Sequence, residues 1–200
     1  MALIEQADVW LFQLLNLHLV HPAADDLMVF LTSESLSGHI YILAALFIAA
    51  RKGREGVAII CLILLAVGLA DFVASGLFKP FFQRVRPCYA LEHVRLLINQ
   101  PNSYSFASSH ASNSAAAAVI TWIFFHKGEL IEKLFTIIMF LYALLIAFSR
   151  VYVGVHYPGD VLTGMVIGVF SAALVYLLVS WLWKNIIQVH FIRYDNSCNG

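Results

Sequence analysis

The chain has 200 residues, of which 61% are hydrophobic and 12% are charged, against roughly 25% charged residues in an average soluble domain. Its mean hydropathy is +0.82, so polar side chains are too scarce to cover the apolar ones, which excludes an ordinary soluble protein. Twelve Lys and Arg residues balance twelve Asp and Glu residues, so no basic field is available to bind nucleic acid. We therefore expect an integral membrane protein whose environment is the bilayer and which has no nucleic-acid partner.

In chain order, the hydrophobic pattern first predicts a short helix from Val9 to Val20. Its leucines and Trp10 form an apolar stripe, which is typical of a helix in the membrane interface or, if extended, of a sixth span. A spanning helix needs about 20 mostly apolar residues. Five later segments meet this condition: 27–50, 56–78, 109–126, 131–149 and 159–183. The sequence predicts an all-α membrane helix bundle with five to six transmembrane helices.

The organisation of the chain indicates one unit. No repeat, heptad pattern or low-complexity tract divides it, so we predict a single domain over residues 1–200. The three cysteines, Cys61, Cys88 and Cys198, lie far apart without CxxC spacing. This pattern argues against a disulfide framework and against a zinc site.

Basic residues indicate how the bundle is oriented. Alternate crossings place seven of them on one side: Arg51, Lys52, Arg54, Lys127, Lys133, Lys184 and Arg193. Five fall on the other side: Lys79, Arg84, Arg86, Arg95 and Arg150. Because Lys79, Arg86 and Arg150 belong to a candidate site, the positive-inside rule makes the first side cytoplasmic. In a bacterial host, the second side would be the periplasmic or outer face of the inner membrane.

Polar clusters gather in the loops on this outward side. The first runs from Lys79 to Pro87 after the second span, and alone it is also typical of a snorkelling cationic helix end. The second runs from Ser105 to His110 and opens the third span, where serine is a common N-cap and backbone N–H groups attract anions. By itself, that stretch favours a Ser-capped membrane helix with a bystander histidine.

The third cluster, from Ser149 to Asp160, joins the fourth and fifth spans. Pro158 suits the first turn of a helix, and Asp160 in that turn can fold back towards the imidazole of His156. Such a carboxylate can orient a neutral histidine as a nucleophile. The plainer alternative is a capped helix with an arginine anchor.

The predicted topology brings all three clusters to one membrane face, where they can form a single pocket. Lys79, Arg86 and Arg150 supply cations, a helix N-terminus supplies amide donors, and His110 and His156 can exchange protons or attack. This set suits a phosphate dianion, which carries about −1.5 to −2 charge and gains about 1.5–3 kcal/mol from each charge-assisted contact. The sequence therefore predicts a phosphate site that requires no metal ion.

The spacing of these residues resembles the type 2 phosphatidic acid phosphatase family. The matching pattern is Lys79, six residues, Arg86-Pro87, then Ser108-x-His110, then Ser149-Arg150, five residues, His156, three residues, Asp160. The middle motif departs from the family, which usually has Pro-Ser-Gly-His where this chain has Ala107-Ser108-Ser109-His110. The essential Ser and His positions are retained, and Ser109 in place of glycine marks a difference in the backbone beside the phosphate.

The resemblance implies a chemical role for each matched residue. His156 would attack phosphorus to give a phosphohistidine, Asp160 would orient His156, and His110 would protonate the leaving oxygen. The phosphate oxygens would be bound by Lys79, Arg86, Ser108, Ser109 and Arg150. Family members use no metal ion and no cofactor, and water hydrolyses the phosphohistidine.

The implied substrate is a phosphomonoester or diphosphate of a lipid. Phosphatidylglycerophosphate, undecaprenyl diphosphate, phosphatidate and lipid A phosphates all remain open, and the loop from Cys88 to Asn102 is the expected headgroup selector, with an interfacial helix over Tyr89–Ile98. Alternatives are a lipid-to-lipid phosphotransferase and a non-catalytic lipid-phosphate binding or carrier protein. Asp71, two turns before Lys79 inside a span, is expected to have a structural partner.

Overall fold

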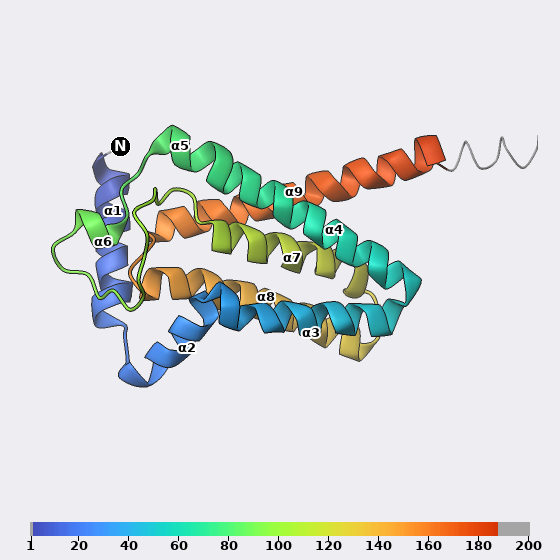
Figure 1. Ribbon diagram of the computed structural model, residues 1–200, viewed down its shortest axis with the longest axis horizontal. Coiled ribbons are helices and arrows are strands. Elements are labelled where there is room, and N and C mark those ends of the chain that lie inside the picture. The colour runs from blue at the N-terminus through green and yellow to red at the C-terminus, as the bar shows by residue number, and fades with distance from the viewer. Residues whose placement is uncertain (1, 188–200) are drawn as a thin grey trace, which may run out of the picture.

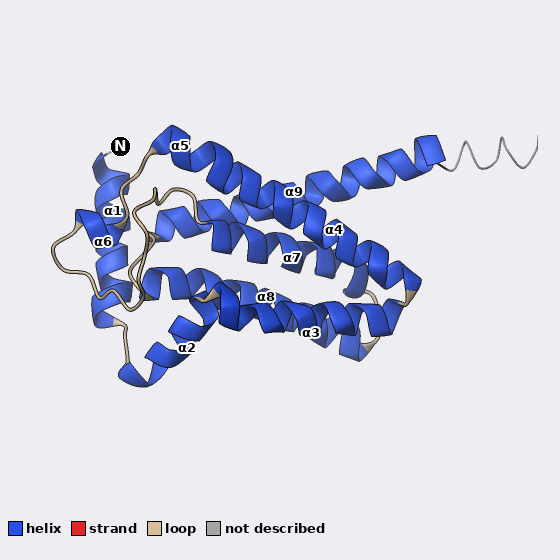
Figure 2. Cartoon of the chain, in the orientation of Figure 1, coloured by secondary structure: helices blue, strands red, loops and turns tan. Residues whose placement is uncertain are grey.

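The computed structural model describes residues 2–187, and every regular element in that range is a helix (Figure 2). The elements are α1 (Ala2–Gln13), η1 (Leu14–His18), α2 (Pro22–Thr32), α3 (Glu34–Lys52), α4 (Arg54–Asp71), η2 (Phe72–Phe78), α5 (Lys79–Phe82), α6 (Pro87–Ala90), α7 (Ser109–Phe125), α8 (Leu130–Tyr152), α9 (Pro158–Leu182) and η3 (Trp183–Ile187). The predicted all-α class is confirmed. Two residues named above, the basic Arg193 and the cysteine Cys198, lie outside the described residues.

The long helices α3, α4, α7, α8 and α9 run along one axis, with α7 in contact with α4, α8 and α9 (Figure 1). The middle of α7 is a buried run of small residues, Ala115 to Ala118, which allows neighbouring helices to approach closely. On α9, a Cβ atom at Gly168 would lie 2.2 Å from the carbonyl oxygen of Ser112. Glycine is therefore required at this crossing, and it fixes the position of α9 against α7.

Within residues 2–187, three segments are long and apolar enough to cross a membrane: Arg54–Ala90, Leu130–Tyr152 and Pro158–Asn185. The helices α3 and α7 run alongside them in the same bundle (Figure 1). The outer faces of the bundle are apolar, since Leu65 on α4 is 57% exposed and Phe170 on α9 is 70% exposed. Such surfaces suit lipid and not water, so the chain is an integral membrane protein.

The span predicted over 27–50 is wrong in one respect, because the chain breaks it at Ser33 into α2 and α3. Ser33 has an extended conformation, with φ −83° and ψ 117°, and its N–H still bonds to carbonyls of α2. The break leaves the Thr32 carbonyl available to Arg150, whose Nη1 lies 3.4 Å away. The break falls where the polar run Ser33–Gly38 interrupts the apolar pattern of the sequence, and the contact with Arg150 lies next to it.

The N-terminal helix begins at Ala2, earlier than the predicted Val9, and continues through η1 to His18. It lies crosswise at one end of the bundle and not parallel to the long helices (Figure 1). This placement favours the interfacial alternative over a sixth span. Phe12 is fully buried there and packs edge-on against Tyr157, with ring centroids 5.6 Å apart.

The loop expected to select headgroups is less helical than predicted, because α6 covers only Pro87–Ala90. The following chain is fixed by contacts with other elements instead. The N–H of Leu97 donates to the Val153 carbonyl at 3.2 Å, and the N–H of Arg95 donates to Asn16 Oδ1 at 2.8 Å. These long-range bonds replace the intrahelical ones that a helix over Tyr89–Ile98 would make.

Among the described residues, the two groups of basic residues that indicate the orientation lie at opposite ends of the bundle. At the end away from α1, Arg51 pairs with Glu129 at 2.7 Å and Lys52 pairs with Glu132 at 3.0 Å. The three polar clusters meet at the α1 end (Figure 1). The predicted convergence of the clusters on one face of the bundle is therefore confirmed for the described residues.

Candidate active site

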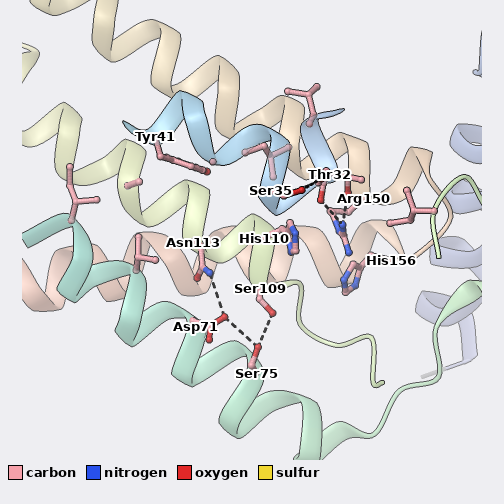
Figure 3. A pocket seen from close by; sticks show the side chains of 18 of the residues that line it. Thr32, Ser35, Tyr41, Asp71, Ser75, Ser109, His110, Asn113, Arg150 and His156 are labelled. Carbon is pink, nitrogen blue, oxygen red and sulfur yellow. Dashed lines mark hydrogen bonds between the residues drawn. The ribbon is translucent and has the colours of Figure 1, made fainter. Parts of the chain in front are cut away.

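A cavity of about 1190 Å³ extends between α2, α3, α4, α7 and α8. Its polar end is lined by Lys79, Arg86, His110, Arg150 and His156. Its deeper walls are mostly apolar and include Ala44, Ile48, Ile60, Ile63, Val67, Ala117, Met139 and Ile146. Figure 3 shows His110, Arg150 and His156 grouped at one end of this space. The cavity can therefore hold an anionic group at one end and a hydrocarbon chain along the other.

His156 lies in the tight connection between α8 and α9 and is 1% exposed. Its Nδ1 is 3.3 Å from Ser105 Oγ and 3.5 Å from Asp160 Oδ2, while its Nε2 is 3.0 Å from Arg86 Nη1. A proton on Nδ1 and a lone pair on Nε2 satisfy both sides of the ring. Burial away from water, helped by the charges of Arg86 and Arg150, lowers the pKa of His156. The residue is therefore a neutral imidazole with its lone pair directed towards a cation.

Asp160 is fully buried in the first turn of α9, where Pro158 begins the helix as predicted. Its Oδ2 accepts a hydrogen bond from the backbone N–H of Tyr157 at 2.9 Å and another from the Ser105 hydroxyl. Its Oδ1 accepts from Arg84 at 2.7 Å. These bonds to the ionised form fix the carboxylate against the Nδ1 side of His156.

Two buried arginines hold positive charge at the polar end of the cavity. The Arg86 Nη1 donates to the Val155 carbonyl at 2.9 Å and its Nε donates to the Ser103 carbonyl at 3.0 Å, both neutral acceptors. Arg150 donates to the Thr32 hydroxyl, and its Nη2 lies 3.5 Å from Gln100 Oε1. The neutral acceptors of Arg86 fix its guanidinium group without cancelling its charge, so this charge remains available to an anion.

Lys79 and the N-terminus of α7 form the opposite wall. The Lys79 Nζ donates to Ser109 Oγ at 2.7 Å and to Ser75 Oγ at 3.3 Å. The next residue, His110, occupies the first turn of α7 and hydrogen-bonds the backbone of Thr32. The residue that replaces the family's usual glycine, Ser109, thus contributes a hydroxyl to the cavity and holds the lysine.

Six of the eight predicted site residues line this cavity: Lys79, Arg86, Ser109, His110, Arg150 and His156. A seventh, Asp160, lies directly behind His156. Ser108 does not line the cavity, because it is the buried N-cap of α7 and its N–H donates to the Asp160 carbonyl at 3.0 Å. The Ser108 Oγ is buried without a hydrogen-bond partner among the described residues, and its contact with phosphate stays a prediction.

Sequence reasoning did not find three residues that support the site, namely Asp8, Arg84 and Ser105. Arg84 was counted only as an outward cation, yet its Nη2 lies 2.7 Å from Asp8 Oδ2 while its Nη1 binds Asp160. Asp8 also accepts from the N–H of Gly159 at 2.7 Å. The position of Arg84, two residues before Arg86, is the feature of the sequence that could have indicated its role. No motif marks Asp8.

Known proteins are similar to this chain in sequence. The chain is 30% identical over 162 residues to the lipid A 4′-phosphatase of Porphyromonas gingivalis. The aligned residues make up 78% of this chain and 66% of that relative. It is 32% identical over 168 residues to the undecaprenyl-diphosphatase of Sulfolobus acidocaldarius, covering 80% of this chain and 73% of the relative. The chain thus spans slightly less than two thirds of the first of these relatives.

The fold is also similar to a solved structure. The crystal structure of a transmembrane PAP2-type phosphatidylglycerolphosphate phosphatase from Bacillus subtilis matches with a TM-score of 0.69 at 27% identity, covering 91% of this chain and 89% of that one. The family model of the PAP2 superfamily matches residues 56–184, which include every residue of the three predicted motifs. With its motif residues gathered at one end of this cavity, the chain belongs to the PAP2 superfamily.

Proposed function

We propose that this protein is a metal-independent lipid phosphatase in which residues 1–200 form one membrane domain and His156 becomes transiently phosphorylated. One observation carries the proposal: a neutral, buried His156 holds its Nε2 lone pair 3.0 Å from Arg86 at the cationic end of a cavity whose deeper walls are mostly apolar. A phosphate bound to that arginine lies next to the lone pair. The family match and the phosphatase relatives support the same chemistry.

Substrate binding follows from the two ends of the cavity. The phosphate oxygens would be bound by Lys79, Arg86, Ser109 and Arg150. The hydrocarbon chain would lie against the apolar residues of α3, α4 and α8. We place this end of the bundle at the outer face of a bacterial inner membrane, because the positive-inside rule favours that orientation.

The reaction would proceed in two displacements. The Nε2 lone pair attacks phosphorus and forms the N–P bond, while the bond from phosphorus to the ester or anhydride oxygen breaks. His110, protonated once the phosphate dianion is bound beside it, donates its proton to that oxygen. Water then attacks the phosphohistidine, passing a proton to His110, and the P–N bond breaks to release phosphate. Asp160 stabilises the positive charge that His156 carries between these steps, and the cations stabilise the equatorial oxygens.

The substrate class is a phosphomonoester or diphosphate of a lipid. The relatives are named for lipid A, undecaprenyl diphosphate and phosphatidylglycerolphosphate, which share a phosphoryl group on a membrane-anchored molecule. A cavity that joins a cationic end to an apolar wall suits all three. The partners that we propose are therefore a lipid phosphate or diphosphate and the surrounding bilayer.

The experiment that tests this proposal measures phosphate release by the detergent-purified protein in excess EDTA, with the three lipids as substrates. Wild type should release phosphate, His156→Ala should not, and His126→Ala, at the opposite end of the bundle, should match wild type. Equal release by wild type and His156→Ala would overturn the assignment of the nucleophile. Release that requires a second lipid as acceptor would instead indicate phosphotransfer, and binding without release would indicate a carrier.

A further inference from the structure

A second polar cluster lines the cavity beyond the phosphate site, and the proposed chemistry does not use it. Asp71 and Ser75 come from consecutive turns of the α4–η2 segment, and Asn113 comes from the facing side of α7 (Figure 3). The Asp71 Oδ1 accepts from Asn113 Nδ2 at 3.4 Å and from Ser75 Oγ at 3.5 Å. Asn113 is thus the partner expected for Asp71, but both bonds are long.

The carboxylate has acceptor capacity that these two bonds leave unused. A carboxylate can accept about four hydrogen bonds, and both bonds reach Oδ1, with none to Oδ2 among residues 2–187. Since Asp71 lines a cavity whose neighbouring wall includes Ile63 and Val67, its remaining acceptor positions are accessible to a bound molecule. Asp71 is exposed, and an ionisable side chain inside a candidate membrane span favours a ligand that supplies the missing donors.

The position of the cluster indicates which part of the lipid would reach it. Asp71 precedes Lys79 by eight residues, so it lies about 12 Å further along the helix axis. Ser75 lies between them and bonds to Ser109 at 2.8 Å, so the polar wall is continuous from the phosphate site to Asp71. With phosphate held at Lys79, the group that carries the phosphate would lie alongside Ser75 and Asp71.

We propose that Asp71 and Asn113 form a subsite for hydroxyl or amide N–H donors on the phosphate-bearing group of the lipid. The inference rests on the proposed function of the same cavity. A saccharide supplies such donors, whereas a polyprenyl chain bonded directly to phosphate supplies none. The subsite therefore favours lipids whose phosphate-bearing group carries several such donors, as a sugar does. A site built to hydrogen-bond a ligand discriminates against analogues that leave its polar groups unpaired.

The test compares kcat/KM for two substrates, a phosphorylated N-acylglucosamine lipid and undecaprenyl phosphate, in the same micelles with EDTA. The ratio in favour of the sugar lipid should fall about tenfold or more in Asp71→Ala, because a charge-assisted bond is lost. Asp71→Asn retains the side-chain volume and should lower the ratio less. Leu65→Ala, on the lipid-facing side of α4, should keep the wild-type ratio. An unchanged ratio in Asp71→Ala, or an equal fall for both lipids, would overturn the proposal.

Failure of the proposed function is distinguished by binding. If wild type releases phosphate from neither lipid, the phosphatase assignment fails, and dissociation constants for the two lipids then decide the subsite. Native mass spectrometry of wild type and Asp71→Ala with each lipid supplies these constants. A loss of preference for the sugar lipid in Asp71→Ala supports the subsite, and equal preference in the two proteins contradicts it.

Discussion

The guanidinium of Arg84 donates to Asp160 Oδ1 at 2.7 Å, and this bond links the N-terminal helix to the carboxylate behind the candidate nucleophile. The Nη2 of Arg84 pairs with Asp8 of α1 at 2.7 Å. The Cζ atom of Arg84 lies over the ring of Tyr157, 3.9 Å from its centroid. Asp160 can orient His156 only while it is itself held in place. A helix without any catalytic motif is therefore part of the support for the site.

Removing Arg84 should slow the chemical step more than it weakens substrate binding. Asp160 would keep the bonds from Ser105 and Tyr157 but lose a charged partner, so we expect Arg84→Ala to lower kcat about tenfold with a smaller change in KM. Arg84→Lys should recover part of the rate, because it restores one charge. Steady-state kinetics of these variants, with Arg54→Ala at the opposite end as the control, check this. Equal kcat in Arg84→Ala and Arg54→Ala would contradict it.

The coupling of Asp8 to Arg84 gives a separate prediction. Asp8→Ala should lower kcat less than Arg84→Ala, since Arg84 would retain its bond to Asp160. Because the two residues share one ion pair, the loss in the double variant should be smaller than the two single losses combined. A double-mutant cycle of kcat measures this interaction, and strictly additive losses in activation free energy would show that Asp8 acts independently of Arg84.

The pH dependence of the reaction should follow from the low pKa of His156. Burial disfavours the imidazolium form, so the pKa lies well below the ordinary 6.5 and the neutral nucleophile persists as the pH falls. The acidic limb of kcat/KM that His156 causes should therefore lie well below pH 6.5. The measurement is a pH profile of kcat/KM. Phosphorus NMR in the same micelles follows the titration of the substrate phosphate, and this contribution is divided out of the profile. A residual limb at pH 6.5 would indicate a water-exposed histidine.

The crossing of α7 and α9 should tolerate no side chain at Gly168. A Cβ there would approach the Ser112 carbonyl to 2.2 Å and Ala115 Cβ to 2.9 Å, so Gly168→Ala must separate the helices. We expect a destabilisation of about 1–3 kcal/mol, seen as a lower Tm in detergent. Gly68 is the matched control, because a Cβ at this α4 position meets nothing within 4 Å. Gly68→Ala should keep the Tm or raise it slightly, and equal Tm values for both variants would exclude the close crossing.

Asn16 should be essential for holding the N-terminal segment against the bundle. This buried side chain donates to the carbonyls of Arg95 and Tyr152, at 3.0 Å and 2.8 Å, and accepts from the Arg95 N–H. Asn16→Ala would leave these backbone groups unpaired, at a cost of about 1–3 kcal/mol. Thermal unfolding should show this loss, with exposed Gln6→Ala as the control. Faster amide exchange over residues 91–98 in Asn16→Ala would locate the effect, and unaltered exchange there would refute it.

The sequence predicted the helix class and the gathering of the polar clusters, because both depend on local signals. Apolar runs of membrane length mark α8 and α9, and polar loops at alternate span ends must meet on one face. Motif spacing then identified His156 and Arg86, which lie in contact at 3.0 Å. The PAP2 superfamily match confirms the resemblance that this spacing indicated.

The remaining features depend on contacts between distant parts of the chain. The break at Ser33 falls in a polar run of the sequence, but no local pattern marks the contact between the Thr32 carbonyl and Arg150, 118 residues later. Asp8 lies on a helix whose apolar stripe indicated only the membrane interface. Ser108 matched a motif, but its N-cap position directs its backbone N–H to α9 and not to the cavity. Such contacts become visible only once the helices are packed.

The measurement that tests the central claim most directly is the trapping of a phosphorylated protein. Wild type mixed with radiolabelled lipid phosphate in EDTA and quenched in alkali, which preserves phosphohistidine, should retain label that acid removes. Peptide mapping should place the label on His156, and His156→Ala should retain none while His126→Ala retains as much as wild type. Label at another residue would contradict nucleophilic attack by His156. Release of phosphate in a single-turnover experiment without any labelled protein at any sampling time would contradict it as well.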